Sequence, residues 1–289
     1  MENGTTAHID AIIPYPDLAP APNPHSLDLA CNQLTLISLR MHEASDRLGV
    51  TVNHQHHEPW RVFSGDERSH GIVPLVVSFR SIYDLNSIVL WHKLCMKLSA
   101  NMQHFELAAG RAGAGPAATA LEHISAWTRT STSRRSILHA AQIYKLLSDR
   151  KVSDIVHPHS IVALFHAALV LGLYIFTVSP SPDSDHTCYE LSDSVDWTDI
   201  DKLGLASPER SSSASGTDSA TARFIQSGGS LSMGNVTLEG GYASARKTLL
   251  HCADLMEGMG RWKSRTFSQI LHIMSDDLTE FNGHDHDDG

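Results

Sequence analysis

Cysteine is scarce in this sequence of 289 residues, and the four that occur are far apart. No two of them form a Cys-x-x-Cys pair. A secreted domain held together by disulfides needs denser cysteine, and structural zinc sites usually use cysteine pairs. The spacing therefore argues against both and favours a reducing compartment. The four cysteines are Cys31, Cys95, Cys188 and Cys252.

Basic residues are also outnumbered. The chain has 22 lysines and arginines against 32 aspartates and glutamates, for a formal net charge of -10. A wholly basic surface for nucleic acid is thereby excluded, because phosphate binding requires clustered lysine and arginine. We assign no DNA-binding residue. The first ten residues lack the basic and apolar regions of a signal peptide.

Catalytic motifs are missing as well. The glycines of RAGAGP, residues 111–116, follow a predicted helix and are not followed by Lys-Ser/Thr, as a phosphate-binding loop requires. The stretch GGSLSMG, residues 228–234, does not give Gly-x-Ser-x-Gly. Asp276 and Asp277 are adjacent, so a helix points them to different sides. We therefore expect no catalytic residue and no enzyme.

Histidines cluster near residue 55 and in the C-terminal tail, where they are the most plausible metal ligands by type. His54, His56 and His57 lie in NHQHHEP, and His284 begins the acidic tail HDHDD. A structural zinc site needs four convergent ligands at fixed spacings. We expect solvated segments with no metal and no cofactor. His166 lies in an apolar stretch and is expected to be a hydrogen-bonded core residue rather than a base.

What the chain does contain is helical periodicity. Apolar residues recur at spacings of three and four in most of the sequence. No alternating run is bounded by hairpin turns, and Val73–Phe79 is the best candidate for a strand. The pattern predicts an all-α fold, a multi-helix bundle around a buried apolar central helix, with a long disordered insertion. The expected helices cover Ser26–Gly49, Ile82–Ala109, Pro116–Thr128, Ser133–Ser148, Ile161–Val178, Tyr242–Met259 and Arg265–Leu278.

The run Ile161–Val178 is apolar on all sides and carries no formal charge. Its length reaches the lower bound for crossing a bilayer, so a membrane anchor is one alternative. His166 and Gly172 weaken that alternative, and no basic cluster or aromatic belt follows the run. A buried central helix is the preferred prediction. The predicted core residues are Ile137, Ala141, Tyr144, Leu164, Phe165, Leu169 and Leu173.

Residues 179–222 change character and are rich in Ser, Asp and Pro, which is typical of a disordered linker. Within them, acidic and apolar residues alternate from Cys188 to Leu205. This composition is typical of activation segments that present apolar side chains to a partner groove, although a solvated insertion with a few anchoring residues has the same composition. The candidate activation residues are Leu191, Val195, Trp197, Ile200 and Leu203.

These elements divide the chain into five parts. A Pro-rich lead-in covers residues 1–25. The first part of a helical regulatory domain covers 26–178, the acidic, Ser-rich linker 179–222, and the C-terminal part of the helical domain 223–280. An acidic tail covers 281–289.

Four segments together resemble the fungal-specific transcription factor domain of zinc-finger regulators in filamentous fungi. Their order and spacing carry the resemblance, rather than any one sharp motif. They are LWHKLCMKLSANMQHFELAAGRAGAGP (Leu90–Pro116), RRSILHAAQIYKLLSDRKVSD (Arg134–Asp154), SIVALFHAALVLGLYIF (Ser160–Phe176) and GGYASARKTLLHCADLMEGMGRWKSRTFSQILHIMSD (Gly240–Asp276).

The resemblance implies a helical regulatory domain of a nuclear regulator of RNA polymerase II genes. Its implied partners are the transcription machinery, co-regulator proteins and a small-molecule effector. In the family, zinc is held by an N-terminal DNA-binding module, and this sequence lacks that module. DNA contact is therefore expected only through the missing zinc module, and membrane contact is not expected. A membrane-anchored helical protein and a helical small-molecule-binding protein are the alternatives.

Overall fold

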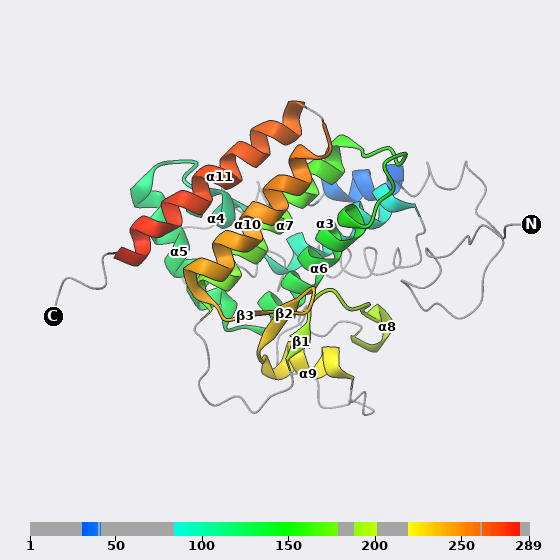
Figure 1. The fold of residues 1–289 in the computed structure, drawn as a ribbon. Coiled ribbons are helices and arrows are strands. Elements are labelled where there is room, and N and C mark those ends of the chain that lie inside the picture. The colour runs from blue at the N-terminus through cyan, green and yellow to red at the C-terminus, as the bar shows by residue number, and fades with distance from the viewer. Residues whose placement is uncertain are drawn as a thin grey trace, which may run out of the picture.

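The computed structural model describes residues 31–39, 41, 84–178, 188–200, 219–260 and 262–283. This part is mostly helical, with one small sheet (Figure 1). The all-α prediction is therefore confirmed. Five predictions fall outside the described residues: the lead-in 1–25, the histidines of NHQHHEP, the strand Val73–Phe79, Leu203 and the histidine-containing tail from His284 onward.

The helices occupy nearly the positions that periodicity predicts. Residues 31–39 and 41 are helical. The labelled helices are α3 (Leu85–Ser99), α4 (Met102–Ala108), α5 (Ala114–Thr128), α6 (Ser131–Ser148), α7 (Pro158–Thr177), α8 (Trp197–Ile200), α9 (Ala220–Ser227), α10 (Gly241–Glu257) and α11 (Trp262–Gly283).

Helix α7 lies at the centre of the bundle. It begins with Pro158 in its first turn, where the missing N–H costs nothing. It packs against α3, α4, α5, α6, α10 and α11, and α10 crosses over it in Figure 1. Because α7 is apolar on every side, only enclosure by several neighbours removes all of its surface from water. The prediction of a buried central helix is confirmed.

The predicted core residues lie in that interior or at its edge. The structure buries all of them except Tyr144, which is half-buried against the same cluster. Ala141 and its neighbour Ala140 are both buried on α6. The buried members are Ile137, Ala141, Leu164, Phe165, Leu169 and Leu173.

Gly172 sets the distance between α7 and α10. A Cβ atom at this position would lie 2.6 Å from Leu249 Cδ2 and 2.8 Å from Leu249 Cγ. We therefore expect Gly172→Ala to destabilise the fold by about 1 to 2 kcal/mol, because overpacking outweighs the gain of about 1 kcal/mol in helix propensity. Urea denaturation followed by circular dichroism measures the change.

Gly258 provides a matched control for this substitution. It follows α10 with helical backbone angles, φ -61° and ψ -15°, and an added Cβ would make only ordinary contacts, at 3.5 Å and beyond. Gly258→Ala should therefore be nearly neutral. In the Gly172→Ala background, Leu249→Val should cost less than it does alone, since it makes room for the added methyl. Equal destabilisation by the two glycine variants would contradict the close approach.

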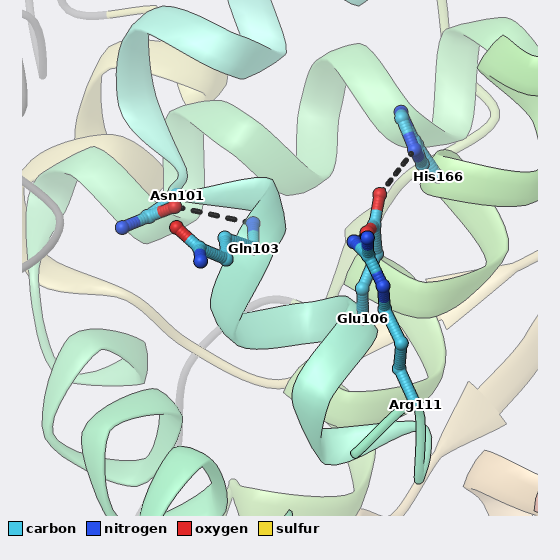
Figure 2. A network of polar contacts seen from close by, with 5 residues as sticks. All are labelled: Asn101, Gln103, Glu106, Arg111 and His166. Carbon is cyan, nitrogen blue, oxygen red and sulfur yellow. Dashed lines mark hydrogen bonds and ion pairs between the residues drawn. The ribbon is translucent and has the colours of Figure 1, made fainter. Parts of the chain in front are cut away.

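The single helix predicted over Ile82–Ala109 is wrong, because the chain breaks between α3 and α4. Ala100 and Asn101 are extended, and the Asn101 side chain accepts a hydrogen bond from the backbone N–H of Gln103 at 3.1 Å (Figure 2). An asparagine competes in this way with the helical backbone. Apolar spacing continues across the break, so periodicity alone did not reveal it.

A small sheet was also missed. Strand β1 (Tyr189–Glu190) pairs in parallel with β2 (Leu231–Met233), which pairs in antiparallel fashion with β3 (Val236–Leu238). The turn between β2 and β3 has positive φ at both Gly234 and Asn235. Glycine and asparagine tolerate that conformation and favour tight hairpins. The lack of an alternating run in the sequence did not reveal this hairpin, because its strands are too short to show alternation.

Residues 188–200 belong to the folded core, although they fall within the predicted insertion. Leu191 and Ile200 are fully buried and Trp197 is 8% exposed, while Val195 is half-buried. The interpretation of these residues as an exposed activation segment is corrected here, because side chains in the core are not available to a partner. The acidic residues between them face outward, so the composition matches a solvated segment anchored by apolar residues.

Candidate functional site

A polar network joins α4 to the central helix at the edge of the core. The Nε2 atom of His166, on α7, lies 3.3 Å from a carboxylate oxygen of Glu106, on α4. Arg111, in the turn after α4, pairs with the other oxygen of the same carboxylate. Figure 2 shows His166 and Arg111 converging on Glu106 from opposite ends. One carboxylate therefore serves two nitrogen groups.

Burial decides the protonation state of this pair. Desolvation lowers the pKa of His166, and the hydrogen bond to Glu106 opposes that effect. The pKa of Glu106 is lowered chiefly by the hydrogen bond from His166, with Arg111 adding to it. The consistent state is a neutral imidazole that donates from Nε2 to an ionised carboxylate. The Nδ1 atom of His166 is buried and has no hydrogen-bond partner within the described part of the chain.

Two lysines of α3 lie beside this pair. Lys93 and Lys97 are one helical turn apart, and both act electrostatically on His166. Lys93 is only 9% exposed. Burial, together with repulsion from Lys97, lowers the pKa of Lys93 to about 8. Burial also lowers the pKa of Lys97, and attraction to Glu106 opposes that shift.

A second buried group lies between α3, α6 and α8. His92 and His139 approach each other with their Nδ1 atoms 3.0 Å apart. The His139 ring stacks on Trp197 with centroids 4.0 Å apart and an angle of 11°. Trp91 packs edge-on against both imidazoles. Desolvation lowers the pKa of His92 to about 3 and that of His139 well below its usual value.

The distance between the two imidazoles requires one hydrogen and one lone pair between them. The geometry therefore excludes two protonated rings, which would place two N–H groups face to face. Desolvation lowers the pKa of both rings and favours the neutral form of each. Arg135, which is also buried, further disfavours a proton on His139. The group is a neutral, packed aromatic cluster and not an acid–base pair in contact with water.

The buried thiols of Cys95 and Cys252 have pKa values raised to about 12 by desolvation, so they stay protonated and unreactive. Among the described residues, no group of three or more histidines, cysteines and acidic residues could hold a metal.

The candidate motifs of the sequence do not converge on one place. Asp276 forms an exposed ion pair with Arg246 at 3.4 Å. Gly110 and Gly113 adopt positive φ values where α4 ends and α5 begins. His166 is the one candidate that joins the polar network, and it has the hydrogen bond that was expected of it.

Sequence reasoning missed Lys93, Lys97 and Glu106 as members of a site. The sequence feature that could have pointed to this site is the spacing of four residues between Lys93 and Lys97 on an otherwise largely apolar helix. Such lysines are usually on a solvated face, so only the structure shows that one of them is enclosed.

Helix α7 is the described element that is long and apolar enough to cross a membrane. Its mean hydropathy is 2.1, and 83% of its apolar window is buried inside the protein. A core helix of a folded domain meets the same criterion, so the finding is weak evidence for a membrane span.

No family model, no curated protein and no solved structure matches this chain.

Proposed function

We propose that this chain is a non-catalytic regulatory and protein-interaction domain of a fungal RNA polymerase II transcription factor, acting in the nucleus. Its partners would be the transcription machinery or co-regulator proteins. The sequence contains no zinc module, so we propose no DNA contact by these residues. Zinc would belong to a separate DNA-binding module.

One observation carries the proposal. The four segments in which the sequence resembles the fungal regulatory domain form a single packed unit. They supply most of α3, α4, α6, α7, α10 and α11, and the contacts α3·α6, α6·α7, α7·α10 and α10·α11 connect them in one core. Segments that are separated along the chain therefore share one structural role, as expected of one domain.

The environment of α7 favours this proposal over a membrane anchor. A lipid-facing helix would leave its apolar surface uncovered, but α7 is enclosed by six other helices. Because these helices already cover the apolar surface of α7, burying that surface requires no bilayer. Recovery of the full chain in the soluble fraction without detergent would agree with this environment.

A tethering experiment tests the regulatory role. The full chain is fused to an unrelated DNA-binding domain and directed to a polymerase II reporter in a fungal host. We expect a several-fold change in reporter output, in either direction, relative to the DNA-binding domain alone. Reporter transcript and the nuclear level of the fusion are measured together.

The variants Gly172→Ala and Gly258→Ala serve as a matched pair in the same assay. The first strains the core and should reduce the reporter effect, whereas the second makes only ordinary contacts and should preserve it. A fusion that accumulates in the nucleus and leaves the reporter unchanged would refute the proposed function.

A further inference from the structure

Residues 188–200 contact the helical domain in the way that an extended peptide contacts a receptor. Strand β1 adds in parallel to β2 at the edge of the β2–β3 hairpin, next to α9 (Figure 1). The backbone N–H of Tyr189 donates to the carbonyl of Ser230 at 2.8 Å. The N–H of Leu191 donates to the carbonyl of Ser232 at 2.9 Å. In strand addition of this kind, main-chain bonds supply affinity and side-chain pockets supply specificity.

Side chains of α6 also bind the backbone of this segment. Gln142 Nε2 donates to the carbonyl of Asp193 at 2.8 Å. Lys145 Nζ donates to the carbonyl of Ser192 at 2.6 Å. Because the acceptors are main-chain carbonyls, these two bonds would form equally with an extended peptide of another sequence.

The first side chains of the segment are recognised individually. The carboxylate of Glu190 accepts hydrogen bonds from the backbone N–H groups of Gly234 and Asn235, at 2.8 and 3.0 Å, in the turn between β2 and β3. Successive backbone N–H groups in a turn form a cradle for an anion. The ring of Tyr189 stacks on Phe224 of α9 with centroids 4.6 Å apart. An aromatic residue followed by a carboxylate therefore fits this end.

Two apolar side chains complete the recognition. Leu191 is fully buried, and Trp197 is 8% exposed. The Trp197 ring stacks on His139 and lies edge-on to Trp91 and His92. The pattern that the domain accommodates is thus an aromatic residue, a glutamate and an apolar residue, with a tryptophan six positions after the apolar residue.

We propose that α6, α9 and the β2–β3 hairpin form a peptide site, occupied here by residues 188–200, and that an acidic segment of a partner protein with the same pattern replaces them. No disulfide fixes the segment, since Cys188 is a free thiol. The inference rests on the proposed function in one respect, because a co-regulator protein would supply the replacing segment. Covalent attachment gives residues 188–200 an effective concentration that the partner must overcome.

Cutting the chain on both sides of the segment tests the proposal. Recognition sequences for a specific protease are inserted in 179–187 and in 201–218, which lie outside the described residues. A labelled synthetic peptide of residues 189–200 is titrated onto the cut and the uncut full chain, and fluorescence anisotropy measures its binding. We expect saturable binding to the cut chain and binding at least about tenfold weaker to the uncut chain, whose own segment competes.

Matched variants locate the recognition. Trp197→Ala in the peptide should weaken binding about a hundredfold, because a buried ring is lost. Ser194→Ala changes an exposed residue of the peptide and should leave binding unchanged. In the cut chain, Lys145→Met removes the donor to the Ser192 carbonyl and should weaken binding several-fold. Lys151→Met, at an exposed lysine between α6 and α7, should have no effect.

Three results would overturn the proposal. The first is the absence of saturable binding to a cut chain that keeps its helical circular dichroism. The second is equal affinity for the parent and the Trp197→Ala peptides. If the cut chain loses its helical signal, the parent peptide should restore it, and the third result is a failure to do so. No reporter enters these measurements, so peptide binding together with a silent reporter would count against the proposed function alone.

Discussion

Replacing Trp197 with alanine should lower the free energy of unfolding by about 3 to 5 kcal/mol, the range for truncating a buried tryptophan. The side chain is 8% exposed and stacks on His139 at 4.0 Å. It also lies edge-on to Trp91 and His92, with ring centroids 5.7 and 5.4 Å away. Removing it would open a cavity beside two buried imidazoles, where few neighbouring groups can move to fill it.

Urea denaturation followed by far-ultraviolet circular dichroism measures this loss. Trp197→Phe retains a stacked ring and should lose clearly less stability than the alanine variant. Val152→Ala is the surface control, because Val152 is completely exposed, and its effect should stay within about 0.5 kcal/mol.

This experiment also separates two interpretations of residues 188–200. An exposed activation segment would not contribute to the stability of the helical domain, so Trp197→Ala would leave the unfolding midpoint unchanged. A segment anchored in the core gives the loss described above. An unchanged midpoint would show that Trp197 lies outside the core and would restore the first interpretation.

Mild acid should destabilise the protein through the buried His92–His139 pair. The native pKa of His92 is lowered from 6.5 to about 3, and that of His139 is also lowered well below 6.5. Below pH 6.5 the unfolded chain therefore binds protons that the native state excludes. The stabilisation that these two neutral histidines contribute is fully present well above pH 6.5 and is lost as the pH falls below it.

The expected loss follows from the size of these shifts. Each imidazole contributes at most about 1.4 kcal/mol per pH unit, and less close to pH 6.5, so the pair should cost about 3 kcal/mol between pH 6.5 and pH 5. Glu190, whose pKa is lowered to about 2 by hydrogen bonds from Ser192 and Asn235, loses its contribution only in stronger acid. Urea denaturation at several pH values above 5 therefore isolates the histidines.

A single substitution tests whether the loss of stability in mild acid comes from His92 and His139. His92→Gln retains a hydrogen-bonding group for His139 but removes one titrating ring, so the loss of stability should shrink by about half of the pair's contribution. The contributions of His104, His159 and His166, whose pKa values burial also lowers, should remain. His251→Gln replaces an exposed histidine on α10 and should leave the dependence unchanged. A parent protein whose stability is flat from pH 7 to pH 5 would contradict the neutral, buried state of both rings.

The helices of the core could be predicted because their cause is local. Apolar residues at spacings of three and four produce an amphipathic face whatever it packs against. Charge-free residues on every side of 161–178 leave burial as the only stable outcome in water. The break at Asn101 and the hairpin at Gly234–Asn235 escaped prediction because each depends on one or two residues in a short element.

The candidate sites could not be predicted, because each joins residues that are distant in the sequence. His92 and His139 are 47 residues apart, and their roles appear only when α3 meets α6. Glu106 and His166 meet because α4 packs on α7. Composition placed Trp197 in a solvated segment, whereas in the structure its ring is buried and stacks on His139.

By itself, the sequence determined that this is a helical protein with a central apolar helix, because periodicity and hydrophobicity act along the chain. Only the tertiary structure decided which polar groups are enclosed, since burial depends on neighbours that periodicity does not specify. A lysine on a helix has the same local pattern in water or in an interior. The desolvation that sets the pKa of Lys93 and His92 arises only when the helices assemble.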